Sequence, residues 1–191
     1  MTPTFRTLHP GSAADHSADP SKPHLILVGL PGCGKTTVGK AVAERTGRAF
    51  LDLDQEIERR EATSIGELFA ERGELYFRKR ERELTTELRL VGNMIVAPGG
   101  GWVADPEVVA LVRPPSRLVY LKVNPETALE RLGPMRAMRP LLVRPDPLGE
   151  LNRLLEARKR AYESADDVIN TELYNLQRVI EKVMELASPN R

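Results

Sequence analysis

The sequence predicts an α/β fold of three layers, in which helices cover both faces of a five-stranded parallel sheet. Two observations predict it. From His24 onward, short apolar runs alternate with helical patterns, which is typical of parallel strands joined by helices. The first apolar run also leads directly into a glycine-rich segment and then a helical pattern. The expected strands are His24–Val28, Ala49–Leu53, Met94–Ala97, Leu118–Val123 and a weak one at Asp167–Ile169.

Three helix ends can be read between these strands. A helix that follows the glycine-rich segment should stop near Gly47, because glycine suits a left-handed C-terminal cap. The segment Ser64–Glu67 has the spacing of a capping box and predicts the start of a second helix. Asp105 followed by Pro106 predicts a third helix, with an aspartate N-cap and proline in the first turn.

Length and charge exclude several classes of protein. The 191 residues suffice for one domain, and 28 basic residues against 27 acidic ones leave a net charge of +1. Non-specific binding to nucleic acid or to a membrane surface needs a much larger positive field. The longest apolar run, Leu25–Leu30, is far shorter than the roughly 20 residues of a membrane-spanning helix. Cys33 is the single cysteine and cannot form an intrachain disulfide. We therefore expect a soluble, cytoplasmic protein.

The chain is expected to hold one domain preceded by a tail. Residues 1–23 are rich in proline, serine, alanine and aspartate and have no apolar period, so they are expected to form a flexible tail. They lack the apolar core of a secretory signal. Residues 24–191 show no internal repeat and no second domain.

The segment Gly29–Thr36 carries the strongest chemical signal. Its sequence, GLPGCGKT, fits G-x-x-x-x-G-K-[ST], with an apolar strand before it and a helical pattern after it. Glycines such as Gly32 and Gly34 let backbone N–H groups surround phosphates at the positive end of a helix. Lys35 is expected to reach the β- and γ-phosphates and Thr36 to ligate magnesium. The alternative is an ordinary strand–turn–helix whose glycines only make the turn.

Two neighbours of this loop have weaker interpretations. Thr37 is expected to lie on the helix near the phosphates. Cys33 could carry a thiol activated by the helix terminus, or it could simply be a small side chain that fits the loop. The sequence leaves this choice open.

Acidic residues indicate which kind of phosphate-loop protein this is. No acid ends the strands Met94–Ala97 or Leu118–Val123, where motor and transport ATPases need one to orient water. Asp52 and Asp54 instead stand at the end of the second strand, two residues apart and therefore expected on the same face. One carboxylate could hold magnesium through water, and the other could bind substrate hydroxyls and remove a proton. The alternative is a solvated strand end at which Asp54 caps the next helix.

Two further segments suggest contact with a ligand. Gly99, Gly100 and Gly101 follow a strand, and such a run indicates a close approach of the backbone or a positive φ, unless it is a mere loop. Several prolines interrupt a segment that carries four arginines and no acid, which favours a mobile lid at about 132–146 over a solvated basic loop. The four arginines are Arg131, Arg136, Arg139 and Arg144.

Taken together, these motifs resemble the shikimate kinases over residues 24–187. The resemblance rests on several dispersed motifs in one order, which is far more specific than the phosphate loop alone. The motifs are Gly29–Thr36, Asp52 with Asp54, Ile65–Phe69, Phe77 with Arg78, Gly99–Gly101, Arg139–Leu142, and Arg158 with Tyr162. Pro98 departs from the family, which more often has leucine or threonine there.

The resemblance implies a sheet order of 2-3-1-4-5, a monomer, and ATP with Mg²⁺ and shikimate as ligands. It implies that Asp54 holds the substrate hydroxyls, with Asp52 on the magnesium side. The remaining roles that it implies are a carboxylate grip for Arg78 and Arg158, a backbone N–H from Gly100, an adenine stack for Arg131 and lid closure onto the phosphates for Arg139. Without the resemblance, Arg78 and Arg158 would be read as residues of solvated helix faces.

Three functions remain in competition at this stage. The first is an ATP-dependent shikimate kinase, in which Lys35, Arg139 and Mg²⁺ stabilise the transferring phosphate. The second is a kinase of another carboxylated polyol, such as gluconate. The third is a non-catalytic sensor of the same fold, which would predict a damaged phosphate loop or missing acids, whereas Lys35 and Asp54 are present.

Overall fold

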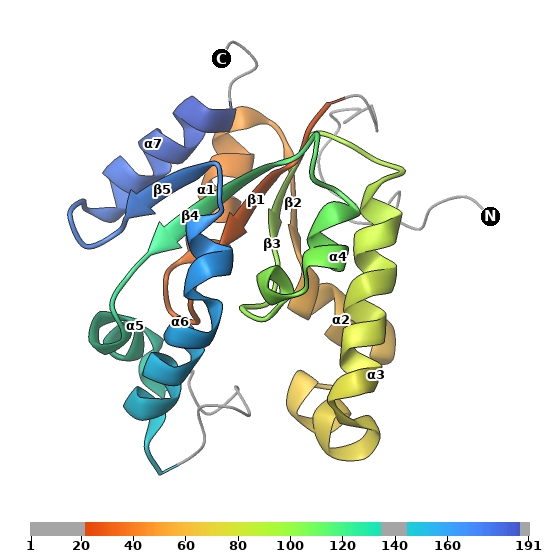
Figure 1. Ribbon diagram of the computed structural model, residues 1–191. Helices are drawn as coiled ribbons and strands as arrows, with labels where there is room; N and C mark the ends of the chain where they lie inside the picture. Colours follow the sequence, from red (N-terminus) through yellow and green to blue (C-terminus); the bar gives the residue numbers. More distant parts are fainter. Residues whose placement is uncertain (1–21, 135–144, 188–191) are drawn as a thin grey trace.

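The computed structural model describes residues 22–134 and 145–187. These residues form a parallel sheet of five strands in the order β2-β3-β1-β4-β5 (Figure 1), as expected. The strands are β1 (Leu25–Val28), β2 (Ala49–Asp52), β3 (Met94–Ala97), β4 (Arg117–Lys122) and β5 (Asp167–Asn170). The helices are α1 (Lys35–Thr46), α2 (Leu53–Glu61), α3 (Ile65–Leu88), α4 (Pro106–Ala110), α5 (Pro125–Leu132), α6 (Pro147–Glu163) and α7 (Leu176–Ala187), with a 3₁₀ turn, η2, at Trp102–Ala104.

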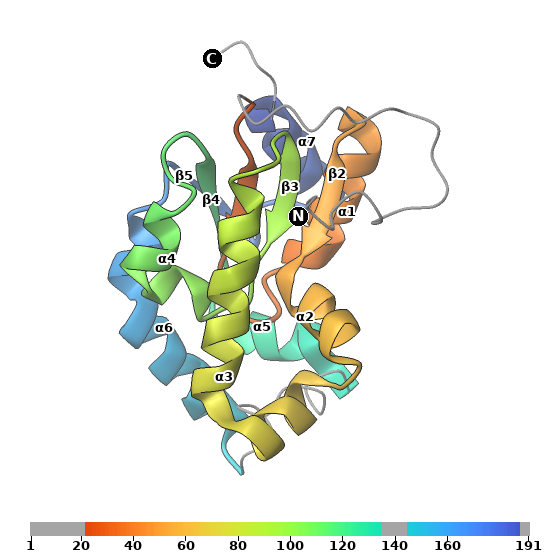
Figure 2. The ribbon, with the colours of Figure 1, turned by 90° about the vertical axis from the view of Figure 1, so that its right-hand side faces the viewer.

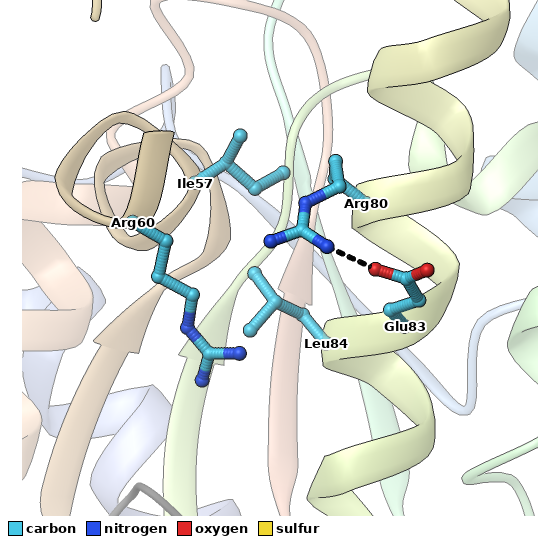
Figure 3. A pocket seen from close by; sticks show the side chains of 5 residues that line it. All are labelled: Ile57, Arg60, Arg80, Glu83 and Leu84. Carbon is cyan, nitrogen blue, oxygen red and sulfur yellow. Dashed lines mark hydrogen bonds and ion pairs between the residues drawn. The ribbon is translucent and has the colours of Figure 1, made fainter. Parts of the chain in front are cut away.

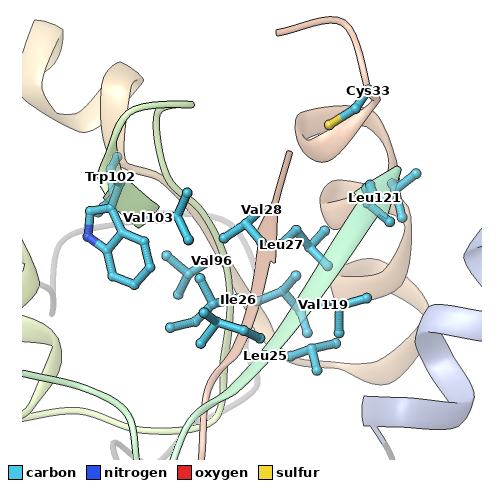
Figure 4. Close-up of a cluster of buried hydrophobic side chains, with 14 of the residues drawn as sticks. Leu25, Ile26, Leu27, Val28, Cys33, Val96, Trp102, Val103, Val119 and Leu121 are labelled. Carbon is cyan, nitrogen blue, oxygen red and sulfur yellow. The ribbon is translucent and has the colours of Figure 1, made fainter. Parts of the chain in front are cut away.

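The sheet lies between two helical layers. Figure 2 shows α3 and α4 in front of the sheet and α1 with α7 behind it. Because both faces are covered, the four residues of β1 are all buried. Figure 4 shows the side chains of β1 flanked by Val96 of β3 and by Val119 and Leu121 of β4. This cluster places the end of β1, and the loop that follows, against a rigid core.

The predicted helix ends are confirmed. Gly47 caps α1 in the left-handed conformation, with φ 67°. Ser64 and Glu67 form the capping box that opens α3. The Asp105 side chain accepts hydrogen bonds from two backbone N–H groups of α4, whose first residue is Pro106.

Four of the predicted strand ranges, those of β1, β2, β4 and β5, are off by one residue, and the end of β2 is the one that bears on the site. β2 ends at Asp52 instead of Leu53, and Leu53 begins α2. The reason is local, because the Asp52 side chain accepts a hydrogen bond from the backbone N of Gln55 and caps α2. Asp54 therefore lies in the first turn of a helix. The expectation that the two aspartates share a strand face is wrong, and so is the alternative in which Asp54 is the cap.

Helix α3 is broken near its start. Gly73 has φ 78° and ψ 169°, which is not helical, so the segment is two helices joined at a kink. The second part runs alongside the sheet and carries Arg78 and Glu81. The kink allows the first part to turn across the carboxyl end of the sheet, towards α2.

A network of charged residues joins α2 to α3. Arg60 binds both Glu56 on its own helix and Glu87 on α3, at 2.7 Å in each case. Figure 3 shows the void next to it, where Arg80 reaches Glu83. That void is only ≈ 10 Å³, about the space of one water molecule, so it is no candidate for a ligand site.

Several expectations fall partly or wholly outside the described residues. Most of the tail expected at 1–23 lies there, and so does most of the lid expected at 132–146, including Arg136, Arg139 and Arg144. Within the described residues, no helix is both long and apolar enough to cross a membrane.

Candidate active site

One cavity of ≈ 720 Å³ lies at the carboxyl ends of the strands. In open α/β sheets this is the edge at which ligands bind. Every predicted site residue that the structure describes lines it. They are Gly32, Cys33, Gly34, Lys35, Thr36, Thr37, Asp52, Asp54, Arg78, Gly99, Gly100, Gly101, Arg131 and Arg158. Arg139 lies outside the described residues.

The phosphate loop forms one end of this cavity. It connects β1 to α1, and Gly32 has φ 85°, which favours glycine. A Cβ at Gly32 would also lie 2.3 Å from the carbonyl oxygen of Ala128. Lys35 Nζ donates hydrogen bonds to the carbonyls of Gly29 at 3.0 Å and Leu30 at 3.2 Å. The Lys35 side chain is therefore folded back over the loop, where its ammonium group binds two loop carbonyls.

Cys33 belongs to the core more than to the cavity. Its side chain is 1% exposed and packs with the hydrophobic cluster. Lys35 Nζ lies 3.8 Å from Sγ of Cys33, but reactive cysteines are partly exposed, whereas this thiol is buried, which is typical of a structural cysteine. The structure therefore favours the interpretation of Cys33 as a small side chain that fits beneath the loop.

Thr36 and Asp52 connect the phosphate loop to the second strand. The Thr36 hydroxyl donates a hydrogen bond of 2.7 Å to Oδ2 of Asp52. A hydroxyl and a carboxylate are hard oxygen ligands of the kind that Mg²⁺ uses together with substrate phosphates. No cluster of three or more histidine, cysteine, aspartate or glutamate residues suited to a metal occurs in the described ranges. The hydroxyl of Thr36 and the carboxylate of Asp52 thus offer two neighbouring oxygen atoms of the type that could hold Mg²⁺.

The three glycines after β3 make room for three side chains. A Cβ at Gly99 would lie 2.6 Å from Asp54 Oδ1, and one at Gly101 would lie 2.6 Å from Arg78 Nη2. A Cβ at Gly100 would lie 3.2 Å from Arg158 Nη1. No positive φ occurs at these glycines, so close approach is the reason for them.

The loop thus brings together a carboxylate and two guanidinium groups from α2, α3 and α6. Sequence alone could not place Arg78 and Arg158 near each other, because 80 residues separate them. The structure places both at one end of the cavity and not on solvated helix faces.

Glu81 was not predicted, yet it supports this cluster. Its side chain is buried and accepts a hydrogen bond of 2.7 Å from Arg78 Nη1. Burial raises the pKa of Glu81 to about 7; the Arg78 guanidinium opposes this shift, while the Asp54 carboxylate adds to it. The sequence offered one indication of this contact, because Glu81 follows Arg78 by three residues on a helix and such residues are neighbours. A pair of this kind is usually solvated, however, so the spacing alone did not predict burial.

Further residues that the sequence did not single out line the cavity near Arg131. Arg131 of α5 donates hydrogen bonds to the hydroxyl of Thr171 at 2.8 Å and to its carbonyl at 3.0 Å. Tyr174 and Leu176 continue the wall after Thr171. Nothing in the sequence distinguished this connection between β5 and α7 from an ordinary loop.

The fold and this cavity define a P-loop kinase that phosphorylates a small molecule. Residues 31–188 match the model of the shikimate kinase family. The chain belongs to the shikimate kinase family.

Individual relatives agree with this assignment. A shikimate kinase from Symbiobacterium thermophilum is 40% identical over 164 residues, which are 85% of this chain and 94% of the relative. The solved shikimate kinase from Acinetobacter baumannii in complex with shikimate is 35% identical, with a TM-score of 0.81 over 90% of this chain and 96% of that one. A gluconokinase from Sinorhizobium meliloti has a TM-score of 0.53 over 87% of this chain and 91% of that one, but at 14% identity it shares the fold alone.

Proposed function

We propose that this protein transfers the γ-phosphate of ATP to the 3-hydroxyl of shikimate, giving shikimate 3-phosphate and ADP. The observation that carries the proposal is the composition of the cavity. One end is a phosphate loop, and the other presents Asp54, Arg78 and Arg158 around three glycines. Shikimate is a ring with one carboxylate and three hydroxyls. Its site therefore needs guanidinium groups that bind the carboxylate at one side, and a protein carboxylate that accepts hydrogen bonds from the hydroxyls at the other.

In this proposal the nucleotide lies along the phosphate loop. Lys35 exchanges its bonds to the Gly29 and Leu30 carbonyls for the β- and γ-phosphates, because an ammonium gains more from anionic oxygens than from neutral ones. Arg131 and Tyr174 supply the wall against which the adenine stacks. Arg139 closes with the lid and neutralises charge on the transferring phosphate.

Thr36 and Asp52 would hold Mg²⁺, with Asp52 acting through water. The 2.7 Å hydrogen bond between them places both oxygens at the phosphate end of the cavity. A bound Mg²⁺ would supply positive charge that stabilises the charge developing on the phosphates. Metal removal should therefore abolish turnover.

Asp54, Arg78 and Arg158 would orient the acceptor. The two guanidinium groups bind the carboxylate through paired hydrogen bonds, and Gly100 adds a backbone N–H. Asp54 accepts hydrogen bonds from the ring hydroxyls and takes the proton of the attacking one as the phosphate transfers. The protein makes no covalent bond to the phosphate, so its contribution is positioning and charge stabilisation.

We further propose that the enzyme acts as a cytoplasmic monomer without nucleic acid or membrane. Its net charge of +1 and its single cysteine fit that setting. Light scattering on a purified sample would test the monomer.

The test of function is ADP release from ATP and Mg²⁺ with shikimate, gluconate or no acceptor. We expect strong stimulation by shikimate alone. Binding of ATP, measured separately, shows whether the protein is intact. Stimulation by gluconate and not by shikimate would move the assignment to another carboxylated polyol. Intact ATP binding without stimulation by either acceptor would favour a sensor.

A further inference from the structure

The hydroxyl of Tyr162 holds the glycine loop from the side of α6. Tyr162 lies near the end of α6, and its side chain is fully buried at 0% exposure. Its hydroxyl donates a hydrogen bond of 3.0 Å to the carbonyl of Gly100. Its ring stacks on Tyr120 of β4, with centroids 5.0 Å apart and planes 9° from parallel. Packing in the core therefore fixes the position of the ring, and the hydrogen bond from its hydroxyl holds the Gly100 carbonyl in place.

The same hydroxyl also lies near Arg158, one helical turn earlier. Burial raises the pKa of Tyr162, and the Arg158 guanidinium is close enough to oppose that rise; the guanidinium also lies beside Gly100, 3.2 Å from the place of a Cβ. A phenol can donate one hydrogen bond and accept another at the same time. Tyr162 can thus connect the backbone of the glycine loop to Arg158, one of the two arginines proposed to bind the substrate carboxylate.

The opposite side of the loop has an anchor of its own. Trp102 Nε1 donates a hydrogen bond of 2.9 Å to the hydroxyl of Thr85, which in turn donates one of 2.8 Å to the carbonyl of Glu81. This chain connects the loop to α3, the helix of Arg78. The contact of Tyr162 is the matching connection to α6, the helix of Arg158.

We propose that Tyr162 is a positioning residue for the acceptor: it sets the distance between Gly100 and Arg158, and thereby the grip on the substrate carboxylate. The proposal rests on the function proposed above. Tyr162 does not touch the reacting atoms, so it acts through the loop and the arginine. The competing interpretation is that the ring serves only to fill the core.

Replacement of Tyr162 by Phe separates these interpretations, because it keeps the ring and removes the hydroxyl. Tyr120→Phe is the matched control: it removes a hydroxyl from the same aromatic stack, but not the one that binds Gly100. We expect Tyr162→Phe to raise the KM for shikimate roughly threefold to tenfold, the worth of one hydrogen bond. The KM for ATP should not change, and Tyr120→Phe should alter neither constant.

A double variant tests whether Tyr162 acts through Arg158. If it does, adding Tyr162→Phe to Arg158→Ala should change the KM for shikimate by much less than it does in the wild type. Equal effects in both backgrounds would overturn the coupling to Arg158.

Hydrogen exchange of peptides covering residues 98–104 gives a readout that needs no substrate. The backbone N–H of Trp102 binds the Gly99 carbonyl at 3.1 Å, and that of Ala104 binds the Gly101 carbonyl at 3.0 Å. We expect faster exchange in Tyr162→Phe and wild-type exchange in Tyr120→Phe. Unchanged exchange would overturn the anchoring role, whichever acceptor the enzyme uses. If hydrogen exchange in the wild type and in both variants is as expected, but shikimate does not stimulate ADP release by the wild type, the proposed function is wrong and the anchoring role of Tyr162 stands.

Discussion

Gly101 and Arg78 are in such close contact that a methyl group at Gly101 would lie 2.6 Å from Arg78 Nη2. The two residues come from different elements, the turn after β3 and helix α3. Gly101 has φ −87° and ψ −19°, which any residue adopts. The glycine is therefore required by its neighbour and not by its own backbone.

Gly101→Ala should consequently damage the site and not the fold. The arginine tip can move aside, so the free energy of unfolding should change by less than about 1 kcal/mol. The displaced guanidinium should raise the KM for shikimate by roughly tenfold to a hundredfold. Urea denaturation and steady-state kinetics measure the two effects. A large loss of stability with an unchanged KM would contradict this account.

Arg158→Ala should weaken shikimate binding and spare ATP. Removing one of two cations that grip a carboxylate leaves it half paired, at a cost of about 2–5 kcal/mol. Initial rates against each substrate give the two KM values. Arg153→Ala is the matched control on the same helix, because Arg153 is 65% exposed and pairs with Glu150. An unchanged KM for shikimate in Arg158→Ala would remove that residue from the acceptor site.

Asp52 has two separable roles, as N-cap of α2 and as partner of Thr36. Asparagine caps a helix about as well as aspartate, so Asp52→Asn should keep its stability, whereas Asp52→Ala should lose about 1 kcal/mol. Both variants lack the carboxylate and should need more Mg²⁺ for half-maximal rate. Urea denaturation and rates across a magnesium titration test this prediction. A wild-type magnesium requirement in Asp52→Asn would show that the carboxylate does not serve the metal.

Glu81 should make stability depend on pH in an unusual direction. Burial raises its folded pKa to about 7 from the ordinary glutamate value of 4.5, while Arg78, Asp54 and Arg158 also act on it. Between those values the folded state holds more protons than the unfolded state, so this group's contribution to stability falls as pH rises. Glu81→Gln has no such proton to lose.

The free energy of unfolding of Glu81→Gln, relative to that of wild type, should therefore rise between pH 5 and pH 8. Urea denaturation of both proteins at several pH values measures the difference. Parallel pH profiles would show that the carboxyl is not held in its neutral form by burial.

Much of the fold could be predicted because its signals are local. The capping box at Ser64–Glu67, the cap at Gly47 and the phosphate loop each depend on residues within a few positions of one another. The end of β2 was mispredicted by one residue for the same kind of reason. Asp52 offers a helix cap, and that local preference outweighed continuation of the strand.

By itself, the sequence determined the order of strands and helices, the phosphate loop and the residue types available for chemistry. Tertiary structure alone decided that Arg78, Arg158 and Asp54 meet around three glycines, that Glu81 is buried beside them, and that Tyr162 reaches Gly100. The physical reason is range. Caps and turns are set by hydrogen bonds between near neighbours in the chain, whereas convergence and burial depend on how elements far apart in sequence pack together.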